Sequence, residues 1–262
     1  EPGPGPGRWG PAVCVLTGAS RGFGRSLARL LAPRLGQGSV LLLLAQSNER
    51  SWAVPSSSRS CETLLEVGPA KLLPLHVEGA KGICCVVEPI FNCSKLICPS
   101  FLGSLGDISK SFLDLTDPDE INSYFAFNVT SALCLTSTAL QAFGKPPGSS
   151  RTVVNISSLC AVKPFKNWAL YCSGKASRDM MFQVLALEEP DVRVLNYAPG
   201  PLDTDMQLLA RTKTGDPEMR QYFQSLQESG QLIDCTVSAQ KLVNLLEEDT
   251  FSSGAHVDFY DI

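Results

Sequence analysis

Short, mostly apolar runs recur along the chain, separated by polar turns and by stretches with helical spacing. They occupy residues 12–16, 39–45, 152–156 and 192–197. A strand that is buried on both faces of a parallel sheet has such a continuous apolar run, and helices that connect parallel strands account for the stretches between them. We therefore predict a doubly wound α/β fold, a mostly parallel sheet with helices on both faces, formed by a single domain.

The C-terminal half contains clear helical patterns. The run TDPDE at 116–120 has the capping residue, proline and acids of a helix start, and the apolar periodicity predicts a helix over 116–140. Residues 207–230 form a polar helical excursion that breaks at Gly215-Asp216-Pro217, and residues 238–247 form an amphipathic helix. Residues 253–261 alternate in character and predict a last strand.

Two stretches do not fit this pattern. Residues 1–11 are rich in proline and glycine, and they predict a disordered tail ahead of a folded domain over 12–262. Residues 46–102 hold five of the ten cysteines and no sustained helical period, with strand patterns only at 71–77 and 83–87. Because the cysteines after His76 lack any C-x-x-C spacing, we predict no metal site.

Composition and charge describe one ordinary globular domain. The chain has 262 residues, of which 44% are hydrophobic, and a net charge of −4 that offers no basic face for nucleic acid. The longest pure leucine run, 41–44, is far shorter than the roughly 20 apolar residues of a membrane span. The chain has no secretory signal pattern and enough core residues to need no disulfides, so we expect a cytoplasmic protein with free thiols.

The candidate chemistry lies between residues 151 and 175. A strand ends at Ser157 and Ser158, and a loop leads to a helical segment in which Tyr171 and Lys175 stand four residues apart, hence on one face. A nearby cation lowers the pKa of a phenol from its usual value of about 10. With Lys175 in that role, Tyr171 could protonate a carbonyl oxygen held by Ser158. Taken alone, a Tyr-x-x-x-Lys spacing is more often a solvated surface pair.

A glycine-rich turn, TGASRGFG, joins the strand over 12–16 to the next helix. Its glycines allow a tight turn, the close approach of a pyrophosphate and close packing of helix on strand. Arg21 can pair with the 2′-phosphate of NADPH, and residues 45–47 lack the acid that would bind the ribose of NADH. We expect NADPH as the cofactor, bound here by Gly18, Ser20, Arg21, Gly22, Phe23 and Gly24.

A second turn, APGPLDTD, follows the strand over 192–197. Proline and glycine force the chain to turn at the carboxyl edge of the sheet, where Thr204 can offer its hydroxyl to the nicotinamide carboxamide. Residues 203–230 would form a substrate lid that excludes water during hydride transfer. The cofactor contacts expected at this end are Leu202, Asp203, Thr204, Asp205 and Met206.

Together these motifs resemble the short-chain dehydrogenase/reductase family. The chain has the Ser of that family, a Tyr thirteen residues later and a Lys four residues after that, with a TG-x-x-x-G-x-G turn and a P-G-x-x-x-T turn. The resemblance implies carbonyl reduction by Ser158, Tyr171 and Lys175, of which Tyr171 and Lys175 also bind the cofactor. It also implies that Asn128 supports a proton relay, although a buried Asn that bridges helix carbonyls is the alternative.

Residues 46–102 depart from the family pattern. The Asn-Asn-Ala-Gly turn of the family should fall at about 99–103, where the chain has PSFLG, and the family's Asp after the third strand is not evident. The segment is either genuinely divergent or the product of a splicing variant or mistranslated exon. We prefer the second interpretation because the departure begins and ends abruptly between matching flanks.

More narrowly, the stretches VRVLNYAPGPLDTDM and SGAHVDFYD resemble the branch of the family that reduces keto side chains of pterins, the last step towards tetrahydrobiopterin. This resemblance implies a homodimer, with Ser158 and Tyr171 at the side-chain carbonyl and Gly200 along the substrate. A carboxylate can accept two adjacent pterin N–H groups, so Asp258 is the expected anchor, the alternative being a solvated edge charge. A broad-range carbonyl reductase and a catalytically silent dimer partner remain open as rivals.

Overall fold

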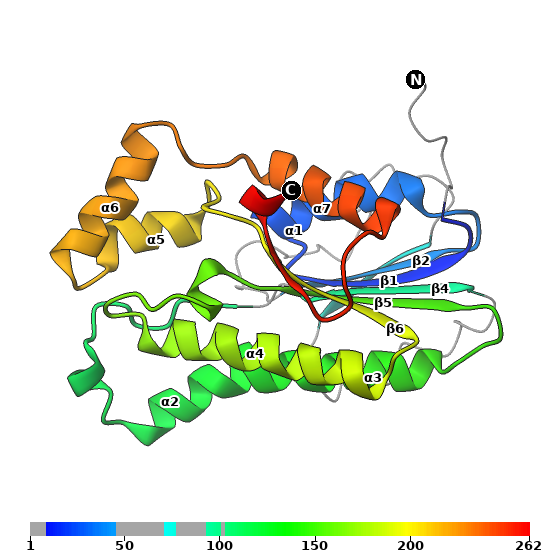
Figure 1. The fold of residues 1–262 in the computed structure, drawn as a ribbon, viewed down its shortest axis with the longest axis horizontal. Coiled ribbons are helices and arrows are strands. Elements are labelled where there is room, and N and C mark those ends of the chain that lie inside the picture. Colours follow the sequence, from blue (N-terminus) through cyan, green and yellow to red (C-terminus); the bar gives the residue numbers. More distant parts are fainter. Residues whose placement is uncertain (1–8, 46–70, 77–92, 101–102) are drawn as a thin grey trace, which may run out of the picture.

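A computed structural model describes residues 9–45, 71–76, 93–100 and 103–262 (Figure 1). Seven strands form one sheet in the order β3-β2-β1-β4-β5-β6-β7, and each neighbouring pair is parallel. The predicted doubly wound, parallel Rossmann-like sheet is therefore confirmed. The strands are β1 Ala12–Thr17, β2 Val40–Ala45, β3 Lys71–His76, β4 Lys95–Ser100, β5 Ser150–Ile156, β6 Val192–Ala198 and β7 His256–Asp258.

Helices cover both faces of the sheet. α1 (Gly22–Leu31) and α7 (Cys235–Glu248) pack on one face, and α3 (Ser131–Phe143) and α4 (Ala169–Glu188) lie along the other (Figure 1). Within the described ranges, no helix is long and apolar enough to cross a membrane. The two faces of the sheet thus have separate hydrophobic cores.

Strand β1 contributes side chains to the hydrophobic cores on both faces of the sheet. Its six residues are all buried, as a strand covered on both faces requires. Cys14 and Leu16 belong to the core under α1 and α7, whereas Val13 and Val15 belong to the core under α3 and α4. Because successive side chains of a strand point to opposite faces, one apolar run supplies both layers.

The strand order determines where a ligand can bind. From β1 the chain moves outward to β2 and β3, and it then returns to form β4 on the other side of β1. The segments that follow β1 and β4 therefore diverge at the carboxyl edge, and doubly wound sheets bind ligands in the crevice at such a switch point. Loops after β1, β4, β5 and β6 meet at this edge.

Strand β4 was not predicted. Its apolar core is only Leu96, Ile97 and Cys98, bounded by a lysine and a proline, which is too short to give a strand signal. Because β4 extends to Ser100, two residues of the PSFLG stretch end a strand instead of forming the family turn. β3 confirms the strand predicted at 71–77, whereas the strand predicted at 83–87 lies outside the described residues.

The helix predicted over 116–140 is interrupted once. It consists of α2 (Pro118–Phe125), a turn of π-helix (Ala126–Thr130) and α3. Asp117 caps α2 by accepting a hydrogen bond from the backbone N–H of Asp119. Single π turns inside α-helices are frequent at functional sites, and this one contains Asn128.

The folded part begins earlier than predicted. Residues 9–11 were assigned to the disordered tail, but the Trp9 N–H donates to the Arg34 carbonyl at 3.1 Å and the Gly36 N–H donates to the Gly10 carbonyl at 2.9 Å. The Trp9 ring also lies 4.7 Å from Lys95 Nζ. Residues 1–8 lie outside the described residues.

α5 (Asp205–Lys213) and α6 (Pro217–Glu228) extend beyond the carboxyl edge of the sheet (Figure 1). Aromatic stacking joins them to the loop before α4, with the Trp168 and Phe223 ring centroids 4.9 Å apart. Trp168 Nε1 also donates to Thr214 Oγ1 at 3.2 Å. The predicted helical excursion and its break near Gly215 are confirmed, and its action as a lid stays a prediction.

Candidate active site

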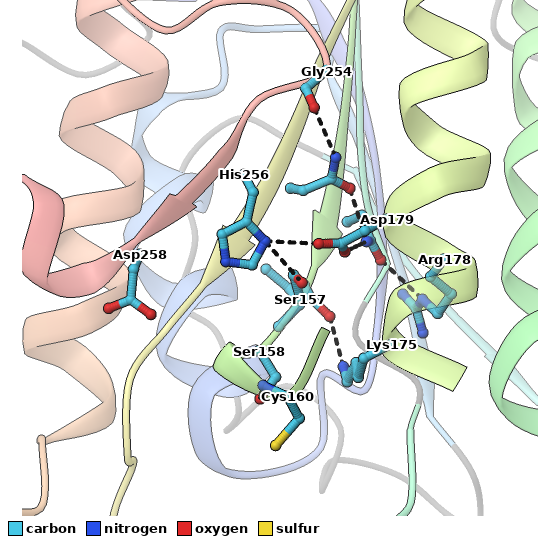
Figure 2. Close-up of polar contacts among 12 residues, drawn as sticks. Ser157, Ser158, Cys160, Lys175, Arg178, Asp179, Gly254, His256 and Asp258 are labelled. Carbon is cyan, nitrogen blue, oxygen red and sulfur yellow. Dashed lines mark hydrogen bonds and ion pairs between the residues drawn. The ribbon is translucent and has the colours of Figure 1, made fainter. Parts of the chain in front are cut away.

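The structure brings Ser158, Tyr171 and Lys175 together at the carboxyl end of β5. Ser158 follows the strand, and its Oγ accepts a hydrogen bond from the Cys160 N–H at 3.2 Å. Tyr171 and Lys175 lie in the first two turns of α4 and are both buried. Lys175 Nζ donates to the Ile156 carbonyl at 2.6 Å, which ties α4 to the end of β5 (Figure 2).

The electrostatics of Tyr171 differ from expectation. Burial raises the pKa of Tyr171 above its ordinary value, while a hydrogen bond from Ser158 and the charge of Arg178 act in the opposite direction. We expected Lys175 to lower this pKa. Burial dominates instead, and it also lowers the pKa of Lys175 to about 7, with Arg178 as the second cause. Lys175 is therefore only partly charged at neutral pH.

Asn128 is buried in the π turn and fully hydrogen-bonded. Its Nδ2 donates to the Tyr124 carbonyl at 2.8 Å, and its Oδ1 accepts from the Ser104 N–H at 2.6 Å. A Cβ added to Gly103 would lie 3.6 Å from Asn128 Oδ1 and 3.9 Å from Lys175 Nζ, so both groups border the same small space. Asn128 thus joins one helix carbonyl to Ser104 and does not bridge two helix carbonyls, and the proton relay stays a prediction.

The glycine turn after β1 has the shape of a phosphate cradle. Gly18 and Gly22 have φ angles of +67° and +52°, a region that favours glycine. A Cβ on Gly24 would lie only 2.2 Å from the Gly18 carbonyl oxygen, so α1 can approach the turn only because residue 24 has no side chain. α1 has no side-chain cap and no acid in its first turn, which suits an anion. The turn thus fits the diphosphate of a dinucleotide.

The glycine turn adjoins the turn after β6. A Cβ on Gly22 would lie 3.4 Å from Thr204 Cγ2, and Arg21 Nη1 lies 2.6 Å from Asp205 Oδ2. The residues predicted to hold opposite ends of the cofactor therefore face one another. Arg21 pairs with Asp205 in an exposed pair that a ligand can exchange at little cost, and its contact with a 2′-phosphate stays a prediction.

The other predicted cofactor residues contribute in different ways. The Phe23 side chain packs on Tyr197 in the core, with ring centroids 6.3 Å apart, so only the Phe23 backbone is left to face a cofactor. The Thr204 hydroxyl caps α5. Met206 Sδ lies 3.9 Å from Tyr171 Oη, which brings the second turn to the candidate proton donor. Ser20, Leu202 and Asp203 line the same two turns.

The predicted substrate residues share one edge of the sheet. Gly200 has a φ angle of +76°, and a Cβ there would lie 2.5 Å from Ile233 Cδ1. Asp258 pairs in register with Ala198, two residues before Gly200. One Asp258 oxygen accepts from the Tyr260 N–H at 3.0 Å and so caps the C-terminal turn. The Asp258 carboxylate also accepts from the Asp261 N–H, and Asp261 Oδ2 accepts from the Asp258 N–H at 3.1 Å, so the two residues form a capping box.

Sequence reasoning missed Arg178 and Asp179, which are 2% and 5% exposed. Arg178 donates to Asn155 Oδ1 at 2.9 Å and to the Ser100 carbonyl at 2.8 Å. Helical spacing could have found both residues. The buried stripe of α4 begins at Leu170 and Tyr171 and repeats every three or four residues, so Arg178 and Asp179 follow Lys175 on the same face.

Comparisons with known proteins agree with this geometry. Residues 89–214 match the family model of short chain dehydrogenases. A short chain dehydrogenase from Escherichia coli CFT073, solved as a complex with NADPH, has a TM-score of 0.71 and 22% identity, covering 98% of this chain and 99% of that one. The chain belongs to the short-chain dehydrogenase family and is an oxidoreductase.

The chain groups, within that family, with the sepiapterin reductases. The enzyme from Rattus norvegicus is 54% identical over 259 residues, covering 98% of this chain and 99% of that protein. The enzyme from Bos taurus is 52% identical over 265 residues, covering 97% of each chain. Both alignments extend across 46–102, the segment in which we found no family motif, and the structure describes that segment only at 71–76 and 93–100.

Proposed function

We propose that the protein reduces the side-chain keto group of sepiapterin and related pterins with NADPH, the last step towards tetrahydrobiopterin. The observation that carries this proposal is the convergence of Ser158, Tyr171 and Lys175 at one sheet edge. The glycine turn lies on one side of them, and Gly200 and Asp258 share the same edge. Identity of more than half with sepiapterin reductases along nearly the whole chain supports the substrate.

NADPH, when bound, supplies the hydride that reaches the carbonyl carbon. Tyr171 Oη gives its proton to the oxygen as that oxygen gains charge, and the Ser158 hydroxyl donates a hydrogen bond to the same oxygen. The raised pKa of Tyr171 keeps the phenol protonated until the transfer. Lys175, with a pKa of about 7, can return a proton towards Tyr171 at neutral pH, next to the Asn128 amide.

Asp258 gives the site a preference for pterins. A pterin presents an amino group beside a ring N–H, and a carboxylate accepts such a donor pair as it accepts guanidinium. The Asp258 carboxylate, which also caps the C-terminal turn, is only partly buried, so a ligand at this edge of the sheet can reach it. A simple diketone has no donor pair, so it should not depend on Asp258.

Asp258→Ala tests this proposal. We expect the KM for sepiapterin to rise by about tenfold or more, the effect of losing a charge-assisted contact, and the kcat/KM for a small 1,2-diketone to change less than about twofold. Glu248→Ala, which removes an exposed carboxylate at the end of α7, is the control and should leave both substrates unaffected. Equal losses with both substrates would remove the anchoring role.

Two further outcomes would favour the rival functions. A wild-type enzyme that reduces the diketone as efficiently as sepiapterin would indicate a broad-range carbonyl reductase. A fluorescence titration that detects no binding of NADPH at micromolar concentrations would indicate a catalytically silent dimer partner.

A homodimer is part of the proposal. Met180, Val184 and Leu187 form an exposed apolar stripe along α4, with Leu187 82% exposed, and Leu133 is exposed on the neighbouring α3. A second copy that packs α3 and α4 against these helices would cover this surface. Sedimentation velocity should give the mass of a dimer, and a monomer at micromolar concentration would contradict the assignment.

The cytoplasm is the proposed compartment. The seven cysteines in the described part of the chain are all free thiols. Free thiols persist in a reducing environment, whereas secreted proteins convert suitable pairs to disulfides.

A further inference from the structure

A buried polar network lies directly behind the catalytic residues (Figure 2). It contains Arg178 and Asp179 from α4, Asn155 from β5 and Asn196 from β6, and all four are almost completely buried. Burying charged and amide groups is unfavourable unless each is paired. The reduction described above uses none of these side chains, so the network needs a separate explanation.

The network connects α4 to the last strand of the sheet. Asn155 Nδ2 donates to Asp179 Oδ1 and to Asn196 Oδ1, both at 2.9 Å. His256 Nδ1 donates to the second oxygen, Asp179 Oδ2, at 2.7 Å. Asp179 is therefore the one acid in the described part of the chain that bonds both to β5 and to β7.

Each member of the Asp179–His256 pair shares an element with a residue of the proposed site. Asp179 follows Lys175 by four residues on α4, so the two occupy one helix face. His256 precedes Asp258 by two residues on β7, and both side chains extend from the same side of that strand (Figure 2). The pair therefore joins the helix that carries the proton donor to the strand that carries the pterin anchor.

Strand β7 is three residues long, lies at the edge of the sheet and pairs with β6 alone among the described strands. Lys241 Nζ also donates to the Phe259 carbonyl at 2.9 Å, which ties the turn after β7 to α7 and not to α4. His256 has a second contact, with Ser157 Oγ 3.4 Å from its Nδ1, next to Ser158. The Asp179 and His256 side chains are 7% and 19% exposed, so solvent screens their attraction less than it screens a surface pair.

We infer that Asp179 and His256 are positioning residues that fix Asp258 relative to Ser158 and Tyr171. By holding β7 against α4 and β5, they set the distance between the carboxylate that binds the ring of a pterin and the groups that act on its side-chain carbonyl. Substrate selectivity then depends on two residues that touch neither substrate nor cofactor. This inference rests on the proposed function, because it requires Asp258 to be the anchor.

Three variants test the inference in the full-length enzyme. His256→Leu removes the donor at similar volume. His256→Asn retains it, because the amide nitrogen of Asn occupies nearly the position of Nδ1. Asp258→Ala removes the anchor itself. We would measure kcat and KM for sepiapterin and for a small 1,2-diketone, and the Kd for NADPH by fluorescence.

His256→Leu should raise the KM for sepiapterin by about tenfold, as expected for a lost charge-assisted hydrogen bond, and leave kcat for both substrates within about twofold. His256→Asn should recover most of the loss. In a double-mutant cycle, His256→Leu should add almost nothing to Asp258→Ala, because the anchor that it positions is already absent. The Kd for NADPH should not change.

Several results would overturn the inference. These are an equal loss with both substrates, an unchanged KM for sepiapterin, or additive effects of the two substitutions. If His256→Leu does not fold, Asp179→Asn enters the same cycle, because it removes the charge at nearly constant shape and should give a smaller change in the same direction. If Asp258→Ala itself shows no selectivity for pterins, the proposed function fails, whereas selectivity in Asp258→Ala without any in His256→Leu rejects the positioning pair alone.

Discussion

The glycine turn and the start of α4 lie at the same edge of the sheet, but different physical effects hold them in place. In the turn, position depends on backbone shape, since Gly18 has a left-handed φ angle and Gly24 leaves no room for a methyl group. In α4, position depends on buried hydrogen bonds, such as those of Lys175 to the end of β5 and of Arg178 to Asn155. A site that depends on backbone shape can be recognised in the sequence as a local motif. A hydrogen-bond network cannot, because its residues come from separate strands and helices.

Tyr171→Phe should give the largest effect on activity. It removes the proposed proton donor but leaves the glycine turn and the buried hydrogen bonds of α4 in place. We expect kcat for sepiapterin to fall by about 10² to 10⁴, the usual contribution of general acid catalysis, with the Kd for NADPH nearly unchanged. The measurement is steady-state turnover alongside a fluorescence titration with NADPH.

Tyr124→Phe is the matched control for this substitution. Tyr124 is also a buried tyrosine, and its hydroxyl donates only to the Ser104 carbonyl, at 3.2 Å. We expect its kcat to stay within a few-fold of wild type. Near-full activity of Tyr171→Phe would disprove the assignment of the proton donor.

Gly24→Ala should give the next largest effect, and it tests the turn alone. The added methyl would meet the Gly18 carbonyl oxygen at 2.2 Å, so the start of α1 must move away from the turn. We expect the Kd for NADPH to rise at least about tenfold, and the free energy of unfolding to fall by about 1–3 kcal/mol, as for other overpacked sites. Chemical denaturation and an NADPH titration measure the two effects.

Gly38→Ala is the control for Gly24→Ala, because it introduces backbone strain without changing the glycine turn that is proposed to hold the diphosphate. Gly38 has a φ angle of +84°, but a Cβ there meets nothing within 4 Å. It should cost about 1 kcal/mol of stability and leave the affinity for NADPH unchanged. A Gly24→Ala enzyme with wild-type affinity would show that the turn does not hold the diphosphate.

Arg21→Gln should give the smallest effect. The Arg21–Asp205 pair is exposed, so its loss should leave the urea midpoint of unfolding unchanged. If Arg21 binds the 2′-phosphate, the preference of kcat/KM for NADPH over NADH should fall by about tenfold. Asp205→Asn keeps the guanidinium and should keep the preference, and a similar fall in both variants would assign selectivity to the pair itself.

Local patterns predicted the fold and the reactive trio. The apolar runs that became β1, β5 and β6 each supply side chains to two cores, and this property is visible in sequence alone. Ser158, Tyr171 and Lys175 lie on one strand end, one loop and one helix that follow each other in the chain. Their spacing can therefore be recognised in the sequence. Strand β4 could not be predicted, because runs of three apolar residues are also common in turns and loops.

Tertiary context determined what the sequence could not show. The raised pKa of Tyr171 results from burial, which depends on Trp168 and on the helices after β6 that pack with it in one cluster. The partners Asp179 and His256 are separated by 77 residues, and no spacing rule connects them. The same applies to Arg178, whose acceptors come from two strands and a π turn.

That π turn fixes where two groups of one residue point. The Asn128 carbonyl accepts a hydrogen bond from Arg178 Nη1 at 3.3 Å, while the Asn128 amide faces Ser104. The hydrogen bonds of a π turn span five residues, one more than those of an α-helix. Removing one residue other than Asn128 from Ala126–Thr130 would therefore close the turn into an ordinary α-helix and leave α2 and α3 in line. The carbonyl and the amide of Asn128 would then lose their present directions, although no residue of the candidate site had been removed.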